Sequence, residues 1–498
     1  MSMRTEEPPP PASTAGSKTP GGASAGRGVA FLSLSKGWFM VAGYAGVFGL
    51  TRLLPKEQYG IYAVVAGIVS ILGDVLIRGT IQAVSRFAAG DPSRAESVKR
   101  AALRLQCLLG GGLFAAYYLL SPLIARFLHD PSLVGPLRVS SLIVLSYSFY
   151  PVYVGFLNGL RRFLLQASLD MTFSTMKLGL MLVFAAAGFG AAGALGGFGL
   201  AAFLILLVAM GFSPAVAPRG RFPLAPLFSF QLFIVVFTVL SNLLLKTDLL
   251  LLKRLSSPAE ANTLAAFYAA AQQLAFIPYQ AIVSVTFVIF PLVSGLTALG
   301  DAGRVRGYIR EALRYSLMLT GLIAVLFSAN APATIRLLFP AGYEAGAGAL
   351  SVLVFGVVFF SLFLVAATAI SGSGRPGLSV LVGLGTLALD VLLNAWLIPV
   401  HGIRGAAVAT TLAMAAGMCA AWGCLRLRFG PCLPILSAAR VAAAGAAVYF
   451  ASGLLPASGI YLAGSFAALA ALYLLLLVAL RELGAADLAR VRKAAGLG

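Results

Sequence analysis

Apolar runs of about 20 residues follow one another from Gly28 to Leu480, and only short polar turns separate them. One helix needs about 20 apolar residues to cross the hydrocarbon core of a bilayer. About fourteen such runs can be marked out, and little sequence remains between them. The pattern therefore predicts an all-α integral membrane protein with about fourteen transmembrane helices.

The turns divide the predicted helices into two groups of six and an appended pair. A segment with four prolines, Ser213 to Phe228, separates the two groups. The predicted order is a disordered cytoplasmic tail (1–27), the first six helices (28–212), a cytoplasmic linker (213–228), the second six helices (229–425), two further helices (435–480) and a basic cytoplasmic tail (481–498).

One polar loop occurs twice, once in each group. The first copy, Val84–Arg104, reads VSRFAAGDPSRAESVKRAALR, and the second, Val293–Arg314, reads VSGLTALGDAGRVRGYIREALR. Four polar residues recur at a constant offset of 210: Asp91, Arg94, Arg104 and Arg126 match Asp301, Arg304, Arg314 and Arg336. Such an offset indicates duplication of a large unit, hence two homologous helical bundles. The loops are expected either to stabilise helix packing or to act only as solvated turns whose charges orient the chain.

The composition also agrees with a membrane location, and a membrane location explains the positive net charge. The chain is 60% hydrophobic and has a formal net charge of +20. In a soluble protein this excess of Lys and Arg would suggest nucleic acid. With the N-terminus inside, however, about 24 of the 36 basic residues fall in inside loops and tails. We therefore expect no nucleic-acid partner and place both termini in the cytoplasm.

Neither a metal site nor a set of catalytic residues is expected. The four cysteines and two histidines have no spacing typical of metal ligands. The predicted outside loops are all short, so no catalytic domain is inserted between the helices. These features predict that the protein is not an enzyme.

Four stretches stand out along the chain: RLLPKEQYGIYAVV (52–65), KTDLLLLKRL (246–255) with FYAAAQQL (267–274), LLFPAGYEAGAGALSVL (337–353) with AISGSGRP (369–376), and DVLLNAWLIPVHGIRGAAVATTLA (390–413). They resemble the polysaccharide-biosynthesis flippase family, which is Wzx-type and belongs to the MATE-like MOP superfamily of multidrug, oligosaccharidyl-lipid and polysaccharide exporters. Their order and spacing extend the resemblance over about residues 29–480.

The resemblance implies two six-helix lobes around a central cavity that opens alternately to either side of the membrane. It also implies a substrate: an oligosaccharide on a polyprenyl diphosphate carrier, flipped from the inner to the outer leaflet of a bacterial inner membrane. The flipped units would build an exopolysaccharide, a capsule or the O-antigen of lipopolysaccharide. Membrane lipids, a glycan polymerase and chain-length machinery are the partners that such a pathway implies.

Four cations within or at the end of predicted helices are candidates for contacting the diphosphate: Lys36, Arg78, Lys177 and Lys246. Charges inside a membrane are costly and mark functional sites by default, and charge-assisted hydrogen bonds are strong there. Each cation has a plainer alternative. Arg78 can pair with Asp74 one turn earlier, and Lys36 lies close enough to a helix end to reach the interface. For Lys177 and Lys246, snorkelling or a local partner remains the alternative.

Three carboxylates are candidates for binding a coupling H+ or Na+: Asp74, Asp248 and Asp390. A carboxylate in apolar surroundings can be neutralised reversibly. Asp390 has a structural alternative, a bond to Asn394 one turn later. Lys246 and Asp248 are two residues apart and are not expected to face each other. No other cofactor is expected.

Amide side chains are weaker candidates for contacts with the sugars. Asn242, Gln272 and Gln273 can each hydrogen-bond a sugar hydroxyl. Each can equally bond a neighbouring helix, so both interpretations stay open.

Three other functions compete with the flippase. A MATE-like exporter of drugs or small molecules would have an acidic, aromatic cavity, whereas this chain has more basic than acidic residues in its spans. A membrane glycan polymerase or ligase would need a large catalytic loop outside the membrane. A major-facilitator carrier also has two groups of six helices, but its short basic loop between the second and third helices is not matched here.

Overall fold

The computed structural model describes residues 22–214, 220–432, 435–456, 459, 461–484 and 487, and every regular element in them is a helix. A helix satisfies its own backbone hydrogen bonds, which a chain surrounded by hydrocarbon requires. The predicted all-α fold is therefore confirmed. Most of the two predicted tails, 1–27 and 481–498, lies outside the described residues.

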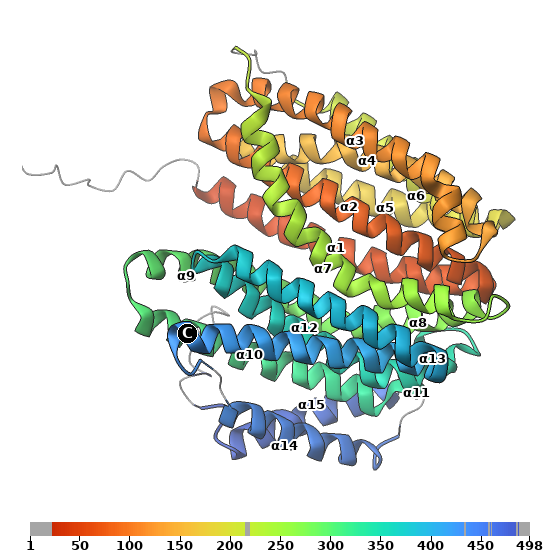
Figure 1. The fold of residues 1–498 in the computed structure, drawn as a ribbon, viewed down its shortest axis with the longest axis vertical. Helices are drawn as coiled ribbons and strands as arrows, with labels where there is room; N and C mark the ends of the chain where they lie inside the picture. The colour runs from red at the N-terminus through yellow and green to blue at the C-terminus, as the bar shows by residue number, and fades with distance from the viewer. Residues whose placement is uncertain are drawn as a thin grey trace, which may run out of the picture.

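The first six long helices pack together as one group, the N-lobe (Figure 1). They are α1 (Gly22–Leu53), α2 (Lys56–Gly90), α3 (Ala95–Phe127), α4 (Val134–Gly159), α5 (Phe163–Phe184) and α6 (Gly190–Gly211). Helix α1 begins inside the segment predicted as a tail, because the last helix-breaking proline of that tail is Pro20.

The second group, the C-lobe, lies beside the first (Figure 1). It consists of α7 (Leu224–Leu255), α8 (Ala261–Ala275), α9 (Ile277–Ala298), α10 (Ala302–Ala329), α11 (Ala331–Leu338), α12 (Ala347–Gly372) and α13 (Pro376–Phe429). Pro278 marks the break between α8 and α9, because proline cannot donate the backbone hydrogen bond that would continue the helix. Gly402 kinks α13 with a φ of 54°, a conformation that favours glycine.

The appended pair, α14 (Ile435–Ser452) and α15 (Tyr461–Ala479), packs against α10 (Figure 1). Ten helical segments of the described residues are long and apolar enough to cross a membrane. Two of these, Phe163–Gly211 with 49 residues and Pro376–Phe429 with 54, are longer than one crossing needs and bend at a glycine. The number of fourteen crossings stays a prediction.

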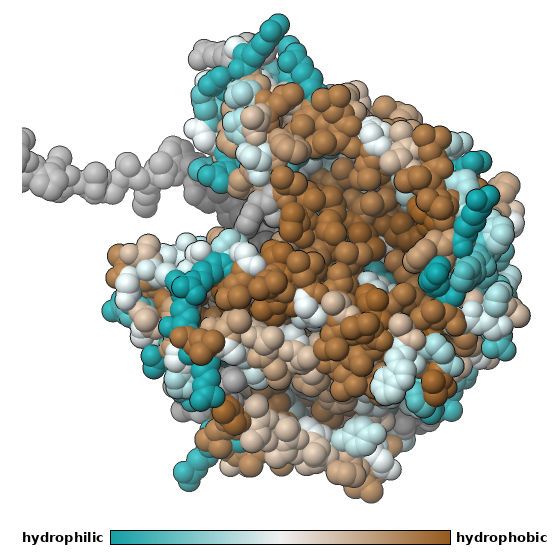
Figure 2. Space-filling model, viewed as in Figure 1, coloured by the Kyte–Doolittle hydropathy of each residue, from teal (hydrophilic) through white to brown (hydrophobic). Residues whose placement is uncertain are grey.

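The helices define two ends of the molecule. The repeat-loop end carries the turns at Asp91 and Asp301, and the opposite end carries the turns at Pro55 and Asp130. In Figure 2, hydrophobic residues cover the middle of the visible face and hydrophilic residues gather toward its left and right sides, where the helices end. This is the distribution expected of a protein that crosses a bilayer.

Helix α7 connects the two lobes and runs obliquely from one to the other (Figure 1). Near its start, Leu227 and Phe230 join a hydrophobic cluster with Phe87 of α2 and Phe156 of α4. Further along it packs against both α2 and α13. Because α7 begins at Leu224, it already includes the end of the predicted linker. Movement of one lobe relative to the other must therefore act on this helix.

Both repeated loops hold the segment of chain that leaves their own lobe. In the N-lobe, Arg94 donates a hydrogen bond to the Arg221 carbonyl (3.3 Å) and Lys99 donates to the Ser213 hydroxyl (3.0 Å). In the C-lobe, Arg306 donates to the Phe429 carbonyl (2.6 Å). The loops therefore contribute to packing at corresponding places and are more than solvated turns.

The two copies differ where the appended pair docks. Arg314 of α10 forms ion pairs with Glu482 (2.6 Å) and Asp487 (3.1 Å) beyond the end of α15. Arg440 of α14 also pairs with Glu482 (3.2 Å). The matching residue of the N-lobe, Arg104, is exposed. The second copy thus anchors two helices that have no counterpart in the N-lobe.

Candidate functional site

Polar side chains from both lobes meet near the middle of α2 and α7. Asp74 of α2 accepts hydrogen bonds from Arg78 on the same helix (3.3 Å) and from the Asn242 amide of α7 (3.2 Å). Arg78 also contacts Tyr279 of α9. The ion pair between Asp74 and Arg78, which their spacing predicts, is therefore present. Its contacts with Asn242 and Tyr279 connect the two lobes.

Lys246 and Asp248 on α7 are linked through one amide of α8. The Lys246 ammonium donates to Gln272 Oε1 (3.1 Å) and lies 4.9 Å from the centre of the Phe276 ring. The amide nitrogen of the same Gln272 donates to Asp248 (3.1 Å). The two charged residues do not bind each other directly, in agreement with their spacing. The structure nevertheless places them in one hydrogen-bonded chain.

Asp248 belongs to a buried cluster inside the C-lobe. Asp248 is 1% exposed, and its carboxylate accepts a hydrogen bond from the Tyr268 hydroxyl (2.6 Å). Asp390 of α13 is 0% exposed and accepts from the Asn394 amide (3.0 Å), the local bond considered from the sequence. Thr410, beyond the kink of α13, faces both Asp390 and Tyr268. Two carboxylates from different helices thus share one dry region.

Three oxygen atoms of this cluster have no hydrogen-bond partner among the described residues: Asp390 Oδ2, Asn394 Oδ1 and Thr410 Oγ1. Thr410 faces Asp390, but the two do not have the geometry of a hydrogen bond. Buried polar atoms in proteins are normally paired. Oxygen is the ligand type that hard cations prefer, and a buried carboxylate can alternatively take a proton. The cluster therefore fits a small hard cation such as Na+, or H+, at this place.

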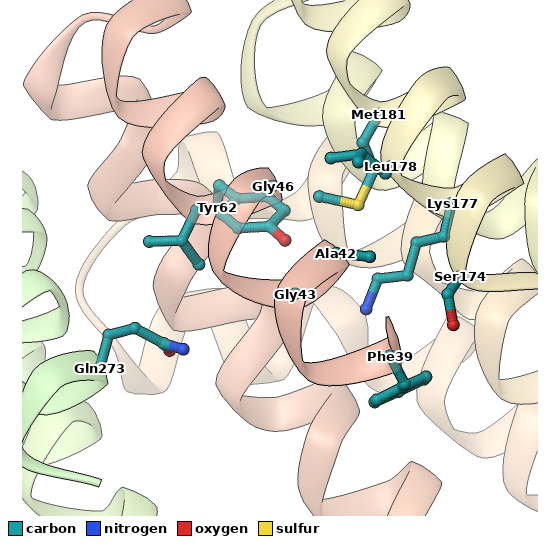
Figure 3. Close-up of a pocket in the computed structure, with 11 residues that line it drawn as sticks. Phe39, Ala42, Gly43, Gly46, Tyr62, Ser174, Lys177, Leu178, Met181 and Gln273 are labelled. Atoms are coloured by element: carbon teal, nitrogen blue, oxygen red, sulfur yellow. The ribbon is translucent and has the colours of Figure 1, made fainter. Parts of the chain in front are cut away.

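A cavity of about 200 Å³ lies in the N-lobe between α1, α2 and α5, and Gln273 of α8 borders it from the C-lobe (Figure 3). Lys177 enters from α5 and extends its ammonium toward α1, 4.0 Å from the centre of the Phe198 ring. Gly43 of α1 leaves space beside the ammonium, and Tyr62 supplies a hydroxyl. Since a water molecule occupies about 30 Å³ of liquid, the cavity has room for a phosphate-sized group but not for an oligosaccharide.

The cations of the N-lobe differ in what balances their charge. No carboxylate of the described residues lies within 4.0 Å of the Lys177 ammonium, which instead lies over the neutral rings of Phe39 and Phe198. Lys36, in contrast, pairs with Asp170 of α5 (3.0 Å), and its side chain is 67% exposed. An ammonium without a counter-ion in a partly buried cavity attracts an anion, so Lys177 is the stronger of the two candidates.

Neighbouring amides of α8 serve two different places. Gln272 binds Lys246 and Asp248, whereas the side chain of Gln273 borders the Lys177 cavity. Tyr44 of α1 donates to the backbone carbonyl of Gln273 (3.4 Å), which ties α1 to α8. Helix α8 therefore lies between the cavity of one lobe and the carboxylate cluster of the other.

Four further polar residues of these places were not among the predicted site residues: Asp170, Tyr268, Tyr279 and Thr410. Asp170 lies in an apolar helix, and the rule that singles out charges inside the membrane would have included it. The three hydroxyl side chains carry no such signal, since uncharged polar residues are common in membrane helices. Only the packing of α8, α9 and α13 shows where they point.

The chain is similar to known proteins both in sequence and in fold. A family model described as "Polysaccharide biosynthesis protein" matches residues 50–346. The fold is similar to the lipid II flippase MurJ in an inward closed conformation, with a TM-score of 0.74 at 13% identity over 91% of this chain and 99% of that one. It is also similar to an inward-facing multidrug resistance MATE family transporter of the MOP superfamily, with a TM-score of 0.65 at 16% identity over 79% of this chain and 95% of that one.

Two related sequences are described only as uncharacterized membrane proteins. YabM of Bacillus subtilis is 28% identical over 335 residues, which are 62% of each chain. A protein of Methanocaldococcus jannaschii is 30% identical over 127 residues, 26% of this chain and 25% of that one. The chain therefore matches about a quarter of one relative's length and less than two thirds of the other's.

Proposed function

This chain belongs to the polysaccharide biosynthesis protein family, and from that premise we propose that it flips a lipid-linked oligosaccharide. The substrate is a glycan repeat unit on polyprenyl diphosphate, moved from the inner to the outer leaflet of the bacterial inner membrane. The two lobes open alternately toward the two sides. Polymerase and chain-length machinery then use the units to build an exopolysaccharide, a capsule or an O-antigen.

The observation that carries this proposal is the Lys177 cavity. A diphosphate brings at least two negative charges into the membrane, where only cations or hydrogen-bond donors can replace its lost hydration. Lys177 has no carboxylate within 4.0 Å among the residues that the structure describes, and Lys246 is held by the neutral Gln272. Both ammonium groups can bind an anion without first breaking an ion pair. A cationic drug would be repelled at the same place.

Lys36 and Arg78 act later in this scheme, because each is already paired. Arg78 pairs with Asp74, which also binds Asn242 across the lobe boundary. Separation of the lobes breaks the Asn242 contact and exposes Arg78 to a substrate between them. Lys36 can exchange Asp170 for a phosphate oxygen because its own side chain is 67% exposed, and Asp170, whose side chain is 12% exposed, then loses its cation.

The buried C-lobe carboxylates supply the coupling. A Na+ ion bound by Asp390, Asn394 and Thr410, or a proton on Asp390 or Asp248, would neutralise charge where water does not reach. Neutralising Asp248 weakens its hydrogen bond from Gln272, and the amide can then rotate away from Lys246. A proton on Asp248 would in this way change the availability of the Lys246 ammonium.

A reconstituted system tests the proposal. Proteoliposomes containing the full chain receive undecaprenyl diphosphate that carries one fluorescent N-acetylglucosamine, and a membrane-impermeant quencher reports the leaflet. Wild type should equilibrate the probe between leaflets, and Lys177→Gln should slow this by at least about tenfold, the value of one charge-assisted hydrogen bond. Arg138→Gln, which removes an exposed cation beside Tyr118, is the matched control and should behave as wild type.

Two outcomes would reject the proposal. If Lys177→Gln equilibrates the probe at the wild-type rate, the cavity does not bind the diphosphate. If wild type ignores the probe but moves a lipophilic cationic dye across the same vesicles, the protein is an exporter of small molecules.

A further inference from the structure

A second cavity, of about 110 Å³, lies between α10, α13 and α14 at the repeat-loop end. Its walls include Leu313 of α10, Trp422 and Arg426 of α13, Cys432 just after α13, and Ile435 at the start of α14. It shares no lining residue with the Lys177 cavity, and no step of the proposed transport uses it.

One residue that lines the cavity, Trp422, has a hydrogen-bond donor without an acceptor in the described part of the chain. The indole nitrogen of Trp422 is buried and has no partner among the described residues. Leaving a buried donor unpaired is unfavourable, because its hydrogen bond to water is lost and not replaced. Because an indole can only donate, the missing partner must carry an acceptor atom. The other walls are mostly apolar, so a ligand that fits here combines an oxygen atom with apolar groups.

Arg426 adds a positive charge one turn beyond Trp422, on the same face of α13. It is exposed, and no described carboxylate lies within 4.0 Å of it. The neighbouring arginines are already occupied, since Arg306 donates to the Phe429 carbonyl (2.6 Å) and Arg428 to the Ser373 carbonyl (2.7 Å). A single anionic group can accept hydrogen bonds from both the Trp422 indole and the Arg426 guanidinium.

The surroundings indicate hydrocarbon rather than water. Leu427, Ile435 and Leu436 near the cavity are 91%, 70% and 61% exposed. So many large apolar side chains exposed together are typical of a surface that faces lipid in a membrane protein. Trp and Arg at the end of a membrane helix lie at the level of the lipid head groups. A phosphate bound here therefore has acyl chains available beside it.

We propose that this cavity binds an anionic phospholipid. Its phosphate accepts hydrogen bonds from the Trp422 indole and the Arg426 guanidinium, and its acyl chains lie along Leu427, Ile435 and Leu436. Basic pockets between membrane helices commonly bind anionic head groups in this way. The lipid would occupy the junction between the C-lobe and the appended pair, and this assignment does not depend on what the protein transports.

Tryptophan quenching tests the site directly, because the chain has only three tryptophans, Trp38, Trp396 and Trp422. The variant W38F/W396F keeps Trp422 alone, and W38F/W422F keeps Trp396 alone. Trp396 is 70% exposed and lies toward the opposite end, which makes it a lipid-facing control. The full chain in nanodiscs is titrated with phosphatidylglycerol or phosphatidylcholine brominated on the acyl chains, and the emission is recorded.

Half-maximal quenching of Trp422 should need about a fivefold lower fraction of brominated phosphatidylglycerol than of brominated phosphatidylcholine. This is the preference for an anionic lipid that one basic residue near the membrane surface provides. Adding Arg426→Gln should reduce this preference to about one, and Trp396 should show no preference. Equal quenching of Trp422 by both lipids, or a preference that survives Arg426→Gln, would overturn the site. If inorganic phosphate in detergent shifts Trp422 emission while the lipids show no preference, the ligand is a soluble anion and the lipid assignment is wrong.

Discussion

Replacing Asp130 with asparagine should open the end of the molecule opposite to the repeated loops. Asp130 lies in the turn between α3 and α4, and its carboxylate accepts from Lys253 of α7 (2.7 Å) and Asn262 of α8 (3.0 Å). Lys253 also donates to Asn262 (2.6 Å), and its side chain is 2% exposed. These three residues tie the N-lobe to the C-lobe at this end.

The size of the effect follows from the burial of Lys253. Removing one partner of a buried ion pair costs about 3–5 kcal/mol, because the other charge stays in a dry place. Asn262 remains as an acceptor, so we expect the lower value, about 3 kcal/mol. When the lobes separate, the Lys253 ammonium is hydrated again. The substitution therefore raises the free energy of the closed arrangement only. The equilibrium should shift toward the open one by roughly 100-fold.

This contact should not respond to ordinary changes of pH. Burial raises the pKa of Asp130, but hydrogen bonds from Lys253, Ser132 and Asn262 outweigh it and hold the pKa below its usual value of 3.8. A carboxyl group with a lowered pKa contributes stability above its unfolded pKa, and this contribution disappears only as the pH falls through the lowered value. Between about pH 5 and 8, wild type and Asp130→Asn should therefore differ by a constant amount.

Thiol labelling measures the opening. Thr263 donates to Glu57 (3.2 Å) across the lobe boundary near the Asp130 contact, so Thr263→Cys in a chain without its four native cysteines reports separation. A membrane-impermeant maleimide should label this cysteine at least about tenfold faster when Asp130→Asn is present. Asp91→Asn is the matched control, because Asp91 caps a turn with the same sequence, Asp-Pro-Ser, but has no lysine across a lobe boundary.

Equal labelling rates in wild type and Asp130→Asn would refute the reasoning, as would an equal increase with Asp91→Asn. The double variant Asp130→Asn/Lys253→Met gives a further check. It removes the stranded charge, so it should restore much of the closed population, since apolar groups often replace a buried ion pair at little cost.

Three further predictions concern other contacts. Gly60→Ala should also open the opposite end, because the new Cβ would lie 1.8 Å from the Asn262 carbonyl oxygen; labelling at the same reporter cysteine measures it. Asp390→Asn should abolish any stabilisation of the purified protein by Na+ and any dependence of transport on Na+, and unchanged melting shifts with Na+ would contradict the cation cluster. Arg314→Ala should lower the free energy of unfolding by about 2 kcal/mol, since the buried Glu482 carboxylate loses one of its two cations and keeps only Arg440, whereas Arg104→Ala at the matching exposed position should change it by less than about 0.5 kcal/mol.

Contacts along one helix were accessible from the sequence. The bond between Asp74 and Arg78 and the bond between Asp390 and Asn394 each join residues one turn apart, and the geometry of an α-helix makes both predictable. The all-α fold and the two matching halves follow in the same way, from the length of the apolar runs and a constant offset.

Contacts between helices were not accessible, because they depend on how the helices rotate and pack. Lys36 was considered as a cation for the substrate, yet it lies against Asp170, 134 residues away. Lys253 and Asp130 are 123 residues apart, and both are in stretches that read as ordinary helix ends. Gln272 and Gln273 are adjacent in α8 and therefore point in different directions, but the sequence does not show which site each of them reaches.

The sidedness of lipid-linked glycan in cells depleted of this protein tests the central claim most directly. Spheroplasts are probed with a membrane-impermeant glycosidase or lectin that reaches only the outer leaflet. The proposal predicts that undecaprenyl-diphosphate glycan accumulates and becomes inaccessible to the probe, and that wild type but not Lys177→Gln restores access. If the glycan stays fully accessible while the polysaccharide is no longer made, the protein acts after translocation and is not the flippase.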